Sequence, residues 1–517
     1  MKLKKALAVL MASAMIMGMS VTTFASVPVE SDATQVYVEN VDKGAEVWAY
    51  QIVEADYNTN GFIGYVPVKV NDTALVEKAE QPTSAEVSAI AEKINDGTYD
   101  LKKVQLTDND DDGTYNGELN PGYWVVLVRG TSGPVKIYNP MLVGVYYTEN
   151  GVDGAYITDS TADDPLDATA NWSLGTDNAW AKSSDVPFEK TANVETANLG
   201  QEVTYTIDTT IPQYGPEYTT VKFEVNDTLS NLELTGTGTT VTYEDASEWK
   251  EVPAESYEIT GDTEGSTSLK VAFASEWIKA NGGKKVQIKY KATVTGEGVN
   301  TDSHNNSATL TYTNNPGTNN GGKTDIEKVY SFDIDGDITG NILQKVEPGT
   351  TEGAVVPLDD AEFTLYTDAG CTQQYTNSKY PANAATATSD ENGKLYITGL
   401  AAGTYYLKET KAPDGYSLNN TVYKIDITAE IVKEELVSWD INVTDMTTNT
   451  TVQNGFTVSN GTAQPEGGNQ QTQIMNTELS SLPSTGGIGT TIFTIGGCAI
   501  MIAAAGLFFA SRRKESK

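Results

Sequence analysis

The chain contains little cysteine and almost no histidine. Two cysteines and one histidine occur among its 517 residues. A metal site made of several histidines is therefore excluded, and a Ser-His-Asp triad would depend on His304 alone. His304 stands in the polar run 301–306, beside a predicted strand, and we expect it to be a surface residue. Glycine-rich phosphate loops and clusters of zinc ligands are also missing from the sequence, so we expect no enzyme, no cofactor and no metal site.

Positive charge is scarce as well. The chain has 34 Lys+Arg against 70 Asp+Glu, which gives a formal net charge of −36. Such a surface repels nucleic acid and anionic lipid, so neither is expected as a partner. Solubility and mutual repulsion at a cell surface are the simplest use of this charge.

Long apolar runs occur only at the two ends of the chain. At the N-terminus, Lys2, Lys4 and Lys5 precede the apolar stretch 6–19, which is too short to span a membrane comfortably. The small residue Ala25 then offers a cleavage position for a signal peptidase. The sequence predicts a signal peptide over residues 1–25 and an exported protein.

The C-terminal run, 488–510, carries no charge and is long enough for a spanning helix, which needs about 20 residues. The basic cluster 512–514 follows it and would stay on the cytoplasmic face. Directly before the run stands a short motif made of Leu482, Pro483, Ser484, Thr485 and Gly486.

This order of motif, apolar run and basic tail over 482–517 resembles the cell-wall sorting signal of Gram-positive surface proteins. In that family a sortase cysteine cuts between Thr and Gly of LPxTG. The resemblance implies that Thr485 becomes the acyl donor and that everything from Gly486 onward is discarded. The alternative is an ordinary single-span membrane protein with a chance Pro-Ser-Thr-Gly turn.

If both ends are removed, the exported chain retains one cysteine. Cys498 lies in the discarded apolar run, and Cys371 remains alone. No intramolecular disulfide can then form, so an extracellular chain of this length must be strengthened in another way.

Between its two ends the sequence is typical of β structure. Short runs rich in Val, Thr, Tyr and Ile are broken by Gly, Asn and Asp. Residues 35–38 and 66–70 alternate with the period of half-buried strands. Apolar residues at helical spacing predict one helix over 84–94, which residues 95–97 stop. We expect these elements to form a first domain over 26–180.

Two further β segments follow, and a polar linker over 314–322 separates them. They predict a middle domain over 185–318 and a C-terminal domain over 323–478. About seven short strands per segment, with turn signals between them, favour immunoglobulin-like sandwiches. The predicted fold class is therefore all-β, with tandem immunoglobulin-like domains and one short helix in the first of them.

Residues 108–113 repeat the first half of an EF-hand calcium loop. The twelfth position is Leu119, and the acid falls one place early, at Glu118. Calcium affinity should be poor without the bidentate carboxylate at position twelve. A solvated acidic hairpin loop is therefore favoured over a calcium site.

The third domain contains the run 403–416, which resembles the signature strand and loop of Cna-B-type domains. In such domains a glutamate promotes an isopeptide bond between a lysine in the first strand and an asparagine in the last. Residues 343–346 and 358–366 match the opening of such a domain, and 474–476 match its end. The resemblance implies three roles, namely nucleophile, acceptor and catalytic acid, for Lys345, Asn476 and Glu409.

The second domain resembles the Cna-A-like middle domain of pilin backbone subunits. By that resemblance 188–190 supplies the lysine Lys190, 225–230 the acid Asp227, and 306–312 the acceptor Asn306. Asn305 is the alternative acceptor, because a register slip of one residue would turn Asn306 to the other face. No comparable Lys–acid–Asn triplet is evident in the first domain.

The expected chemistry explains these residue types. A lysine buried between two sheets loses hydration, so its pKa falls and the neutral amine becomes a nucleophile. A buried carboxyl group stays protonated more readily and can donate a hydrogen bond to the asparagine carbonyl. The folded chain fixes the geometry, which can be worth roughly 7–11 kcal/mol of the barrier. Taken singly, such residues would be a surface lysine, a turn asparagine and a solvated acid.

One further lysine stands at the first domain boundary. Pilin backbone subunits carry a motif resembling Tyr-Pro-Lys-Asn there, and residues 180–183, Trp-Ala-Lys-Ser, take its place. The resemblance implies that Lys182 attacks the sortase-bound Thr485 of another subunit, although Tyr, Pro and Asn are absent.

The whole resemblance is to the major shaft subunit of a sortase-assembled pilus at the Gram-positive cell surface. It implies a pilus-class sortase and other copies of the chain as partners, and minor pilins and peptidoglycan as further ones, with the membrane only a stage of the precursor. It names no host ligand. The rival interpretation is a monomeric wall-anchored adhesin with the same C-terminus.

Overall fold

The structure is a computed structural model of the full chain. It describes residues 22–24, 28–58, 61–129, 136–149, 172–215, 218–236, 238–296, 298–314, 321–334, 342–377, 385–466, 471–479 and 488–514. The predicted signal peptide lies outside this part except for β1 (Thr22–Phe24), which pairs with β12. The chain forms two compact units. The first comprises Met1–Gly298, Asp302–Ser331 and Ile431–Glu435, and the second comprises Val299–Thr301, Phe332–Glu430 and Leu436–Lys517.

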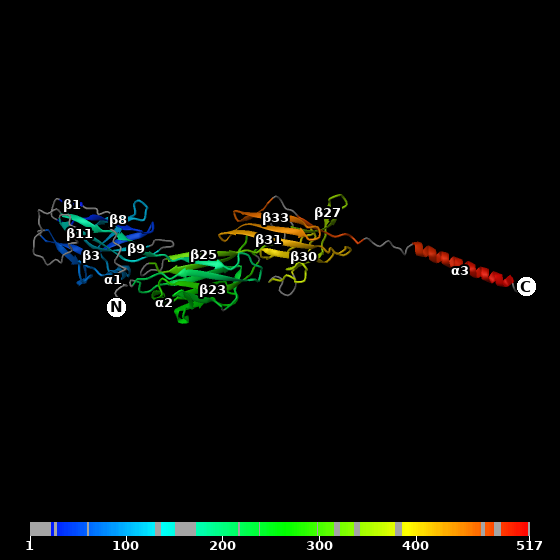
Figure 1. The fold of residues 1–517 in the computed structure, drawn as a ribbon, viewed down its shortest axis with the longest axis horizontal. Coiled ribbons are helices and arrows are strands. Elements are labelled where there is room, and N and C mark those ends of the chain that lie inside the picture. The colour runs from blue at the N-terminus through cyan, green and yellow to red at the C-terminus, as the bar shows by residue number, and fades with distance from the viewer. Residues whose placement is uncertain are drawn as a thin grey trace. The chain divides into compact units, whose positions relative to one another are not determined.

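The N-terminal part of the first unit contains a large antiparallel sheet (Figure 1). Its strands, in spatial order, are β1, β12 (Trp172–Asp177), β11 (Met141–Glu149), β9 (Gly122–Arg129), β3 (Glu46–Asn58) and β4 (Gly61–Pro67), with β7 (Lys103–Leu106) also on β3. A smaller sheet has the order β13 (Ala179–Trp180), β2 (Thr34–Glu39) and β8 (Tyr115–Leu119). Two short pairs are β5 (Lys69–Val70) with β6 (Thr73–Ala74), and β10 (Ile137–Tyr138) with β14 (Ser183–Ser184).

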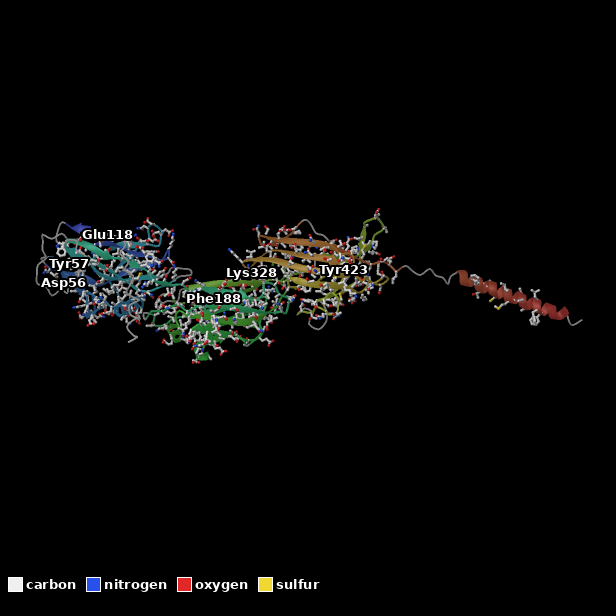
Figure 2. All side chains as sticks on the ribbon, viewed as in Figure 1. Asp56, Tyr57, Glu118, Phe188, Lys328 and Tyr423 are labelled. Atoms are coloured by element: carbon white, nitrogen blue, oxygen red, sulfur yellow. The ribbon has the colours of Figure 1, made fainter. Side chains whose placement is uncertain are left out.

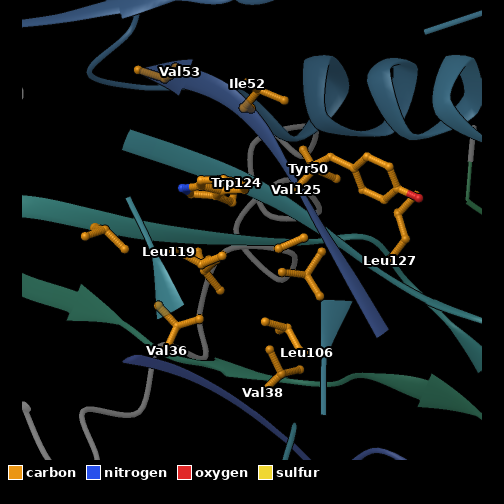
Figure 3. Close-up of a cluster of buried hydrophobic side chains, with 14 of the residues drawn as sticks. Val36, Val38, Tyr50, Ile52, Val53, Leu106, Leu119, Trp124, Val125 and Leu127 are labelled. Carbon is orange, nitrogen blue, oxygen red and sulfur yellow. The ribbon is translucent and has the colours of Figure 1, made fainter. Parts of the chain in front are cut away.

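Figure 3 shows a region of this core in which mostly aliphatic side chains surround the indole of Trp124. Trp124 on β9 is fully buried, and its Nε1 donates to the carbonyl of Asn120 over 2.9 Å. Val36 and Val38 pack there because alternate residues of β2 face inward. The predicted helix forms as α1 (Ser84–Asn95), and a capping box between Thr83 and Glu86 fixes its start.

The rest of the first unit is a pair of sheets around a second core. One sheet has the order β15 (Phe188–Ala192), β16 (Glu202–Thr210), β23 (Lys285–Val294), β19 (Thr240–Asp245) and β20 (Glu248–Glu251), with β18 (Leu232–Leu234) on β23. The other has the order β21 (Tyr257–Thr260), β22 (Ser268–Phe273), β17 (Phe223–Ser230), β24 (His304–Tyr312) and β25 (Gly321–Val329). Two short helices, η1 (Ala254–Ser256) and α2 (Ser275–Ala280), were not evident in the sequence.

The position of β25 corrects the predicted division between the second and third domains. Residues 321–329, assigned from sequence to the linker and the third domain, pair with β24 along its whole length. The backbone N–H of Lys190 on β15 also donates to the Asp325 carboxylate over 2.7 Å. The polar run 314–322 therefore connects two strands of one sheet, and the boundary lies after β25. Phe188 and Lys328, labelled in Figure 2, belong to β15 and β25.

The second unit also contains two sheets. Its large sheet has the order β29 (Thr386–Thr388), β28 (Glu362–Tyr366), β30 (Gly403–Lys411), β31 (Val422–Val432), β32 (Glu435–Asp445), β33 (Thr450–Ser459) and β34 (Thr462–Glu466). The small sheet has the order β27 (Val355–Pro357), β26 (Leu343–Pro348) and β35 (Thr472–Met475). Its first strand, β26, is parallel to its last, β35, so that Lys345 lies opposite Ile474.

The C-terminal apolar run forms a helix, but the predicted membrane span is not supported. Helix α3 covers Ile488–Lys514. Within the described part of the chain, no helix combines the length and the apolar character required to cross a membrane.

His304 is a second correction. It was expected at the surface, yet it is fully buried at the start of β24. Its Nε2 lies 3.0 Å from the Ser331 hydroxyl, which itself donates to the carbonyl of Ala197 over 2.6 Å. Because the single hydroxyl proton of Ser331 is donated to the Ala197 carbonyl, His304 Nε2 carries a proton and donates it to the Ser331 oxygen. The polar neighbours of His304 in the sequence concealed this alternation of buried and half-buried residues.

Candidate functional site: two buried lysine–acid–asparagine groups

Within the described residues, two lysines are buried, Lys190 and Lys345. Both were predicted as nucleophiles, and each contacts the acid predicted for it. Lys345 also contacts its predicted asparagine, Asn476, whereas Asn306 is linked to Asp227 through a tyrosine hydroxyl. We call these sets the middle group (Lys190, Asp227, Asn306) and the C-terminal group (Lys345, Glu409, Asn476). Each of these six residues is at most 2% exposed.

The C-terminal group lies between the two sheets of the second unit. Lys345 Nζ is 2.5 Å from Asn476 Oδ1 and 3.2 Å from Glu409 Oε1. The same Glu409 oxygen accepts a hydrogen bond from Asn476 Nδ2 over 3.0 Å. One carboxylate oxygen therefore contacts both the amine and the amide nitrogen, and the amine lies beside the amide carbonyl.

Backbone contacts hold this group in place. The parallel pairing of β26 with β35 sets the first strand beside the last, and the Asn476 N–H donates to the carbonyl of Val346 over 3.0 Å. The second oxygen of Glu409 accepts from the backbone N–H of Asn419 over 2.5 Å. Lys345 Nζ also donates to the carbonyl of Ile474 over 3.1 Å. The contacts of Asn419 and Ile474 were not predicted, since backbone donors and acceptors leave no signal in the residue types.

The middle group is arranged differently. Lys190 comes from β15 in one sheet, while Asp227 on β17 and Asn306 on β24 come from the sheet facing it. Lys190 Nζ donates to Asp227 Oδ1 over 2.6 Å. The hydroxyl of Tyr290 donates to the other Asp227 oxygen and accepts from Asn306 Nδ2 over 2.7 Å. Tyr290 on β23 thus stands between the acid and the amide.

Burial changes the pKa of both lysines in the direction that the chemistry needs. Loss of hydration lowers the pKa of Lys190 to about 8, and the charge and hydrogen bond of Asp227 oppose this shift only in part. Loss of hydration likewise lowers the pKa of Lys345 to about 8, opposed by Glu409. A larger share of each amine is therefore neutral at physiological pH than for a lysine in water.

The register of β24 distinguishes the two candidate acceptors. Residues of this strand alternate between buried and half-buried, and Asn306 points into the core. Asn305 is half-buried and its Nδ2 donates to the carbonyl of Ser303 over 3.5 Å. The structure therefore brings Asn306, and not Asn305, to Asp227 and Tyr290.

The other predicted site residues are placed less fully. Lys182 lies between β13 and β14 and is half-buried, and its carbonyl accepts from the N–H of Asn139 over 3.2 Å. The motif 482–486 lies outside the described residues. In the 108–113 loop the Asp108 carboxylate accepts from the backbone N–H groups of Asp112 and Gly113. Where the structure describes the chain, no cluster of three or more potential metal ligands occurs, and both cysteines are free.

Three family models match segments of the chain. The T6 antigen Ig-like domain matches residues 31–174, and the prealbumin-like fold domain of SpaA matches 343–441. The LPXTG cell wall anchor motif matches 475–517. A curated relative, the trypsin-resistant surface T6 protein of Streptococcus pyogenes serotype M6, is 26% identical over 560 residues, covering 94% of this chain and 96% of that protein. This chain is similar to the T6 surface protein over nearly its whole length.

The chain is also similar to solved structures of pilins. The T6 backbone pilin of serotype M6 Streptococcus pyogenes has a TM-score of 0.59 and 20% identity, covering 87% of this chain and 100% of that one. The full-length major pilin SpaD from Corynebacterium diphtheriae has a TM-score of 0.48 and 18% identity, covering 88% and 100%.

These findings confirm several predictions from the sequence. The chain carries a wall anchor motif and is a cell-wall-anchored surface protein of the Gram-positive type. Its fold is all-β, with domains of the kind found in pilins. The resemblance to pilin backbone subunits is confirmed, and the chain is related to structural proteins rather than to enzymes.

Proposed function

We propose that this chain is the shaft subunit of a covalent surface pilus. A pilus-class sortase would join Thr485 of one copy to Lys182 of the next, and each copy would carry two internal isopeptide bonds, Lys190–Asn306 and Lys345–Asn476. The same proposal divides the exported chain into a first domain over 26–180, a middle domain from 185 that includes β25, and a C-terminal domain that ends at 478.

One observation carries the proposal. The described chain has two buried lysines, and each contacts a buried acid that is itself linked by hydrogen bonds to a buried asparagine. An unpaired buried ammonium ion would be costly, so a lysine is not kept in such a place for packing alone. The relationship to the T6 protein over nearly the whole chain adds the shaft role.

The geometry of the C-terminal group supports a direct reaction. The neutral Lys345 amine attacks the amide carbon of Asn476. The carbonyl oxygen of that amide, Oδ1, lies 2.5 Å from Lys345 Nζ. Glu409 Oε1 takes a proton from the attacking nitrogen and gives one to the departing nitrogen, since it contacts both. The amide C–N bond breaks, ammonia leaves, and a Lys–Asn amide bond remains.

The two bonds would replace the missing disulfides. Lys345 and Asn476 are 131 residues apart in sequence. In the loop-entropy account of disulfides, closure of a 100-residue loop stabilises the fold by about 4.7 kcal/mol. Each bond joins the first part of its domain to the last, so tension between neighbouring subunits can pass through the bond.

The polymer is tested by the lysine that links it. In cells that make this chain and its sortase, wall extracts boiled in detergent should give a ladder of high-mass species. Lys182→Ala and the charge-preserving Lys182→Arg should both collapse the ladder to the monomer, while attachment to the wall persists. Lys43→Ala, which removes an exposed lysine elsewhere in the first domain, is the matched control and should leave the ladder intact.

Two outcomes would contradict the proposal. A ladder that survives both Lys182 variants would remove this residue from the link. A wild-type chain that reaches the wall only as a monomer would favour the wall-anchored adhesin instead.

A further inference from the structure

The two groups connect acid and amide in different ways. In the C-terminal group, one oxygen of Glu409 touches Lys345 and also the amide nitrogen of Asn476. In the middle group, Asp227 bonds to Lys190 through Oδ1, and its Oδ2 contacts Tyr290, whose hydroxyl in turn contacts the amide nitrogen of Asn306. Tyr290 therefore makes the contact with the amide nitrogen that Glu409 makes itself in the C-terminal group.

Tyr290 is held firmly in this position. It is 2% exposed, and its strand, β23, pairs with β16 in the same sheet. Its ring stacks on Tyr205, with centroids 5.7 Å apart and an interplanar angle of 21°. Lys190 Nζ lies 5.8 Å from the centroid of Tyr290 and 5.4 Å from that of Tyr205. The hydroxyl reaches from the sheet of Lys190 to both reacting partners on the facing sheet.

We propose that the Tyr290 hydroxyl is a catalytic residue of the middle domain, which relays a proton from Asp227 to the departing amide nitrogen of Asn306. This inference rests on the proposed Lys190–Asn306 bond and adds a fourth participant to it. No tyrosine contact to Asn476 is needed in the C-terminal group, because Glu409 reaches the amide nitrogen itself.

The protons balance through one cycle. Lys190, as the neutral amine, attacks the amide carbon of Asn306, and a tetrahedral centre forms whose former amide nitrogen has a free lone pair. Asp227 takes the surplus proton from the Lys190 nitrogen over the 2.6 Å contact. Tyr290 then gives its hydroxyl proton to the former amide nitrogen and takes one in return from Asp227, so the hydrogen bond that Tyr290 donates to Asp227 before the attack reverses. The C–N bond breaks and ammonia leaves, with Asp227 and Tyr290 restored.

The ground-state hydrogen bonds fit this sequence. An amide nitrogen has no lone pair to accept a proton, so before the attack Asn306 Nδ2 donates to the Tyr290 oxygen. After the attack the nitrogen becomes an acceptor and the direction of that bond reverses. Burial and the nearby Asp227 raise the pKa of Tyr290 well above its usual value, so that the hydroxyl keeps its proton until the relay needs it.

The test measures ammonia loss in both domains of one molecule. The exported chain, residues 26–485, is made in a short cell-free pulse and followed by intact mass, and peptide mapping assigns each cross-link. Tyr290→Phe keeps the stacked ring and should slow formation of the Lys190–Asn306 bond by at least about 100-fold, the usual contribution of a positioned acid–base group. The Lys345–Asn476 bond in the same molecules should form at the wild-type rate.

Tyr218→Phe is the matched control, because it removes another buried tyrosine hydroxyl bond from the same core, the 3.2 Å bond to the carbonyl of Asn314. It should leave both rates unchanged. Asp227→Ala supplies the reference for a middle domain without a cross-link. A Tyr290→Phe chain that unfolds at the same temperature as Asp227→Ala is folded and has lost only the bond.

A second variant covers the case in which Tyr290→Phe does not fold. Replacing Tyr290 with 3,5-difluorotyrosine keeps the size of the ring but makes the hydroxyl more acidic. The rate of the middle bond should then differ from that of the wild type at the same pH, because the acidity of the hydroxyl determines how readily it gives its proton to the amide nitrogen. Wild-type kinetics in the difluorotyrosine chain, or in Tyr290→Phe, would overturn the relay. A wild-type chain that loses no ammonia would instead overturn the proposed cross-links themselves.

Discussion

Lys190 and Lys345 are unusual residues because each holds an amine in a core that excludes water. Desolvation of an ammonium ion is expensive, and the adjoining carboxylates recover part of that cost. The lowered pKa of each lysine reflects this balance. An amide bond to asparagine would remove the charge altogether. The residues that make the unreacted state costly are therefore the same ones that make the reaction favourable.

His304 is the titratable side chain whose burial has a consequence for stability. Desolvation lowers its pKa below the usual 6.5. The fold therefore favours the neutral imidazole, and its contribution is complete above the unfolded pKa of about 6.5 and is lost as pH falls towards the lower folded value. We expect the contribution of His304 to the stability of the first unit to be smaller at pH 5.5 than at pH 7.

His304→Asn tests this expectation, since the chain has no other histidine. The variant should be destabilised by roughly 1–3 kcal/mol at pH 7, because the buried Ser331 oxygen loses the hydrogen bond with the His304 ring. The difference in stability between the wild type and the variant should be smaller at pH 5.5 than at pH 7. If denaturant titrations show the same change in the free energy of unfolding between pH 7 and 5.5 for both proteins, His304 does not titrate in this range.

At the scale of single elements, the sequence predicted strands, inward faces and one helix well. The helix predicted over 84–94 forms as α1, and the predicted run 306–312 lies on β24, where Asn306 faces inward. The sequence did not predict the role of Tyr290, because an inward-facing tyrosine on β23 gives the same pattern whether it only packs in the core or also transfers a proton. The edge strand β25 was also missed, since a polar Asn-Gly run before it is equally typical of a linker and of a hairpin connection.

The register of β24 gives a prediction of its own. Asn306→Ala should abolish the middle cross-link, leaving an intact mass short by one ammonia, because it removes the amide that Tyr290 links to Asp227. Asn305→Ala should still lose two ammonias, since that side chain faces away from the group. Intact mass with peptide mapping separates the two variants. Loss of the middle bond in Asn305→Ala alone would mean that the strand is shifted by one residue.

For the whole molecule, the proposed bonds define a covalent path between neighbours in the pilus. It enters at Lys182, passes through Lys190–Asn306 and Lys345–Asn476, and leaves at Thr485. Residues 26–178 stand outside this path and would carry no tension. In agreement, the described lysines of this region are exposed or half-buried, and none is enclosed like Lys345.

The first domain should therefore be the least protected part of the subunit. During graded heating in the presence of trypsin, residues 26–178 should be cut well before 186–478, because ordinary packing alone holds them and several of their lysines are exposed. Gel analysis with mass mapping of the fragments gives the order of cleavage. A first domain that resists as long as the rest, or that contains a third ammonia loss, would contradict this account of the load path.

The internal cross-links are the central claim, and the intact mass of the exported chain, residues 26–485, tests them most directly. The account predicts a mass lower than that of the sequence by two ammonias. Glu409→Ala should restore one of them and Asp227→Ala the other, because each acid serves only its own group. A full, unmodified mass for the folded wild-type protein would contradict the account.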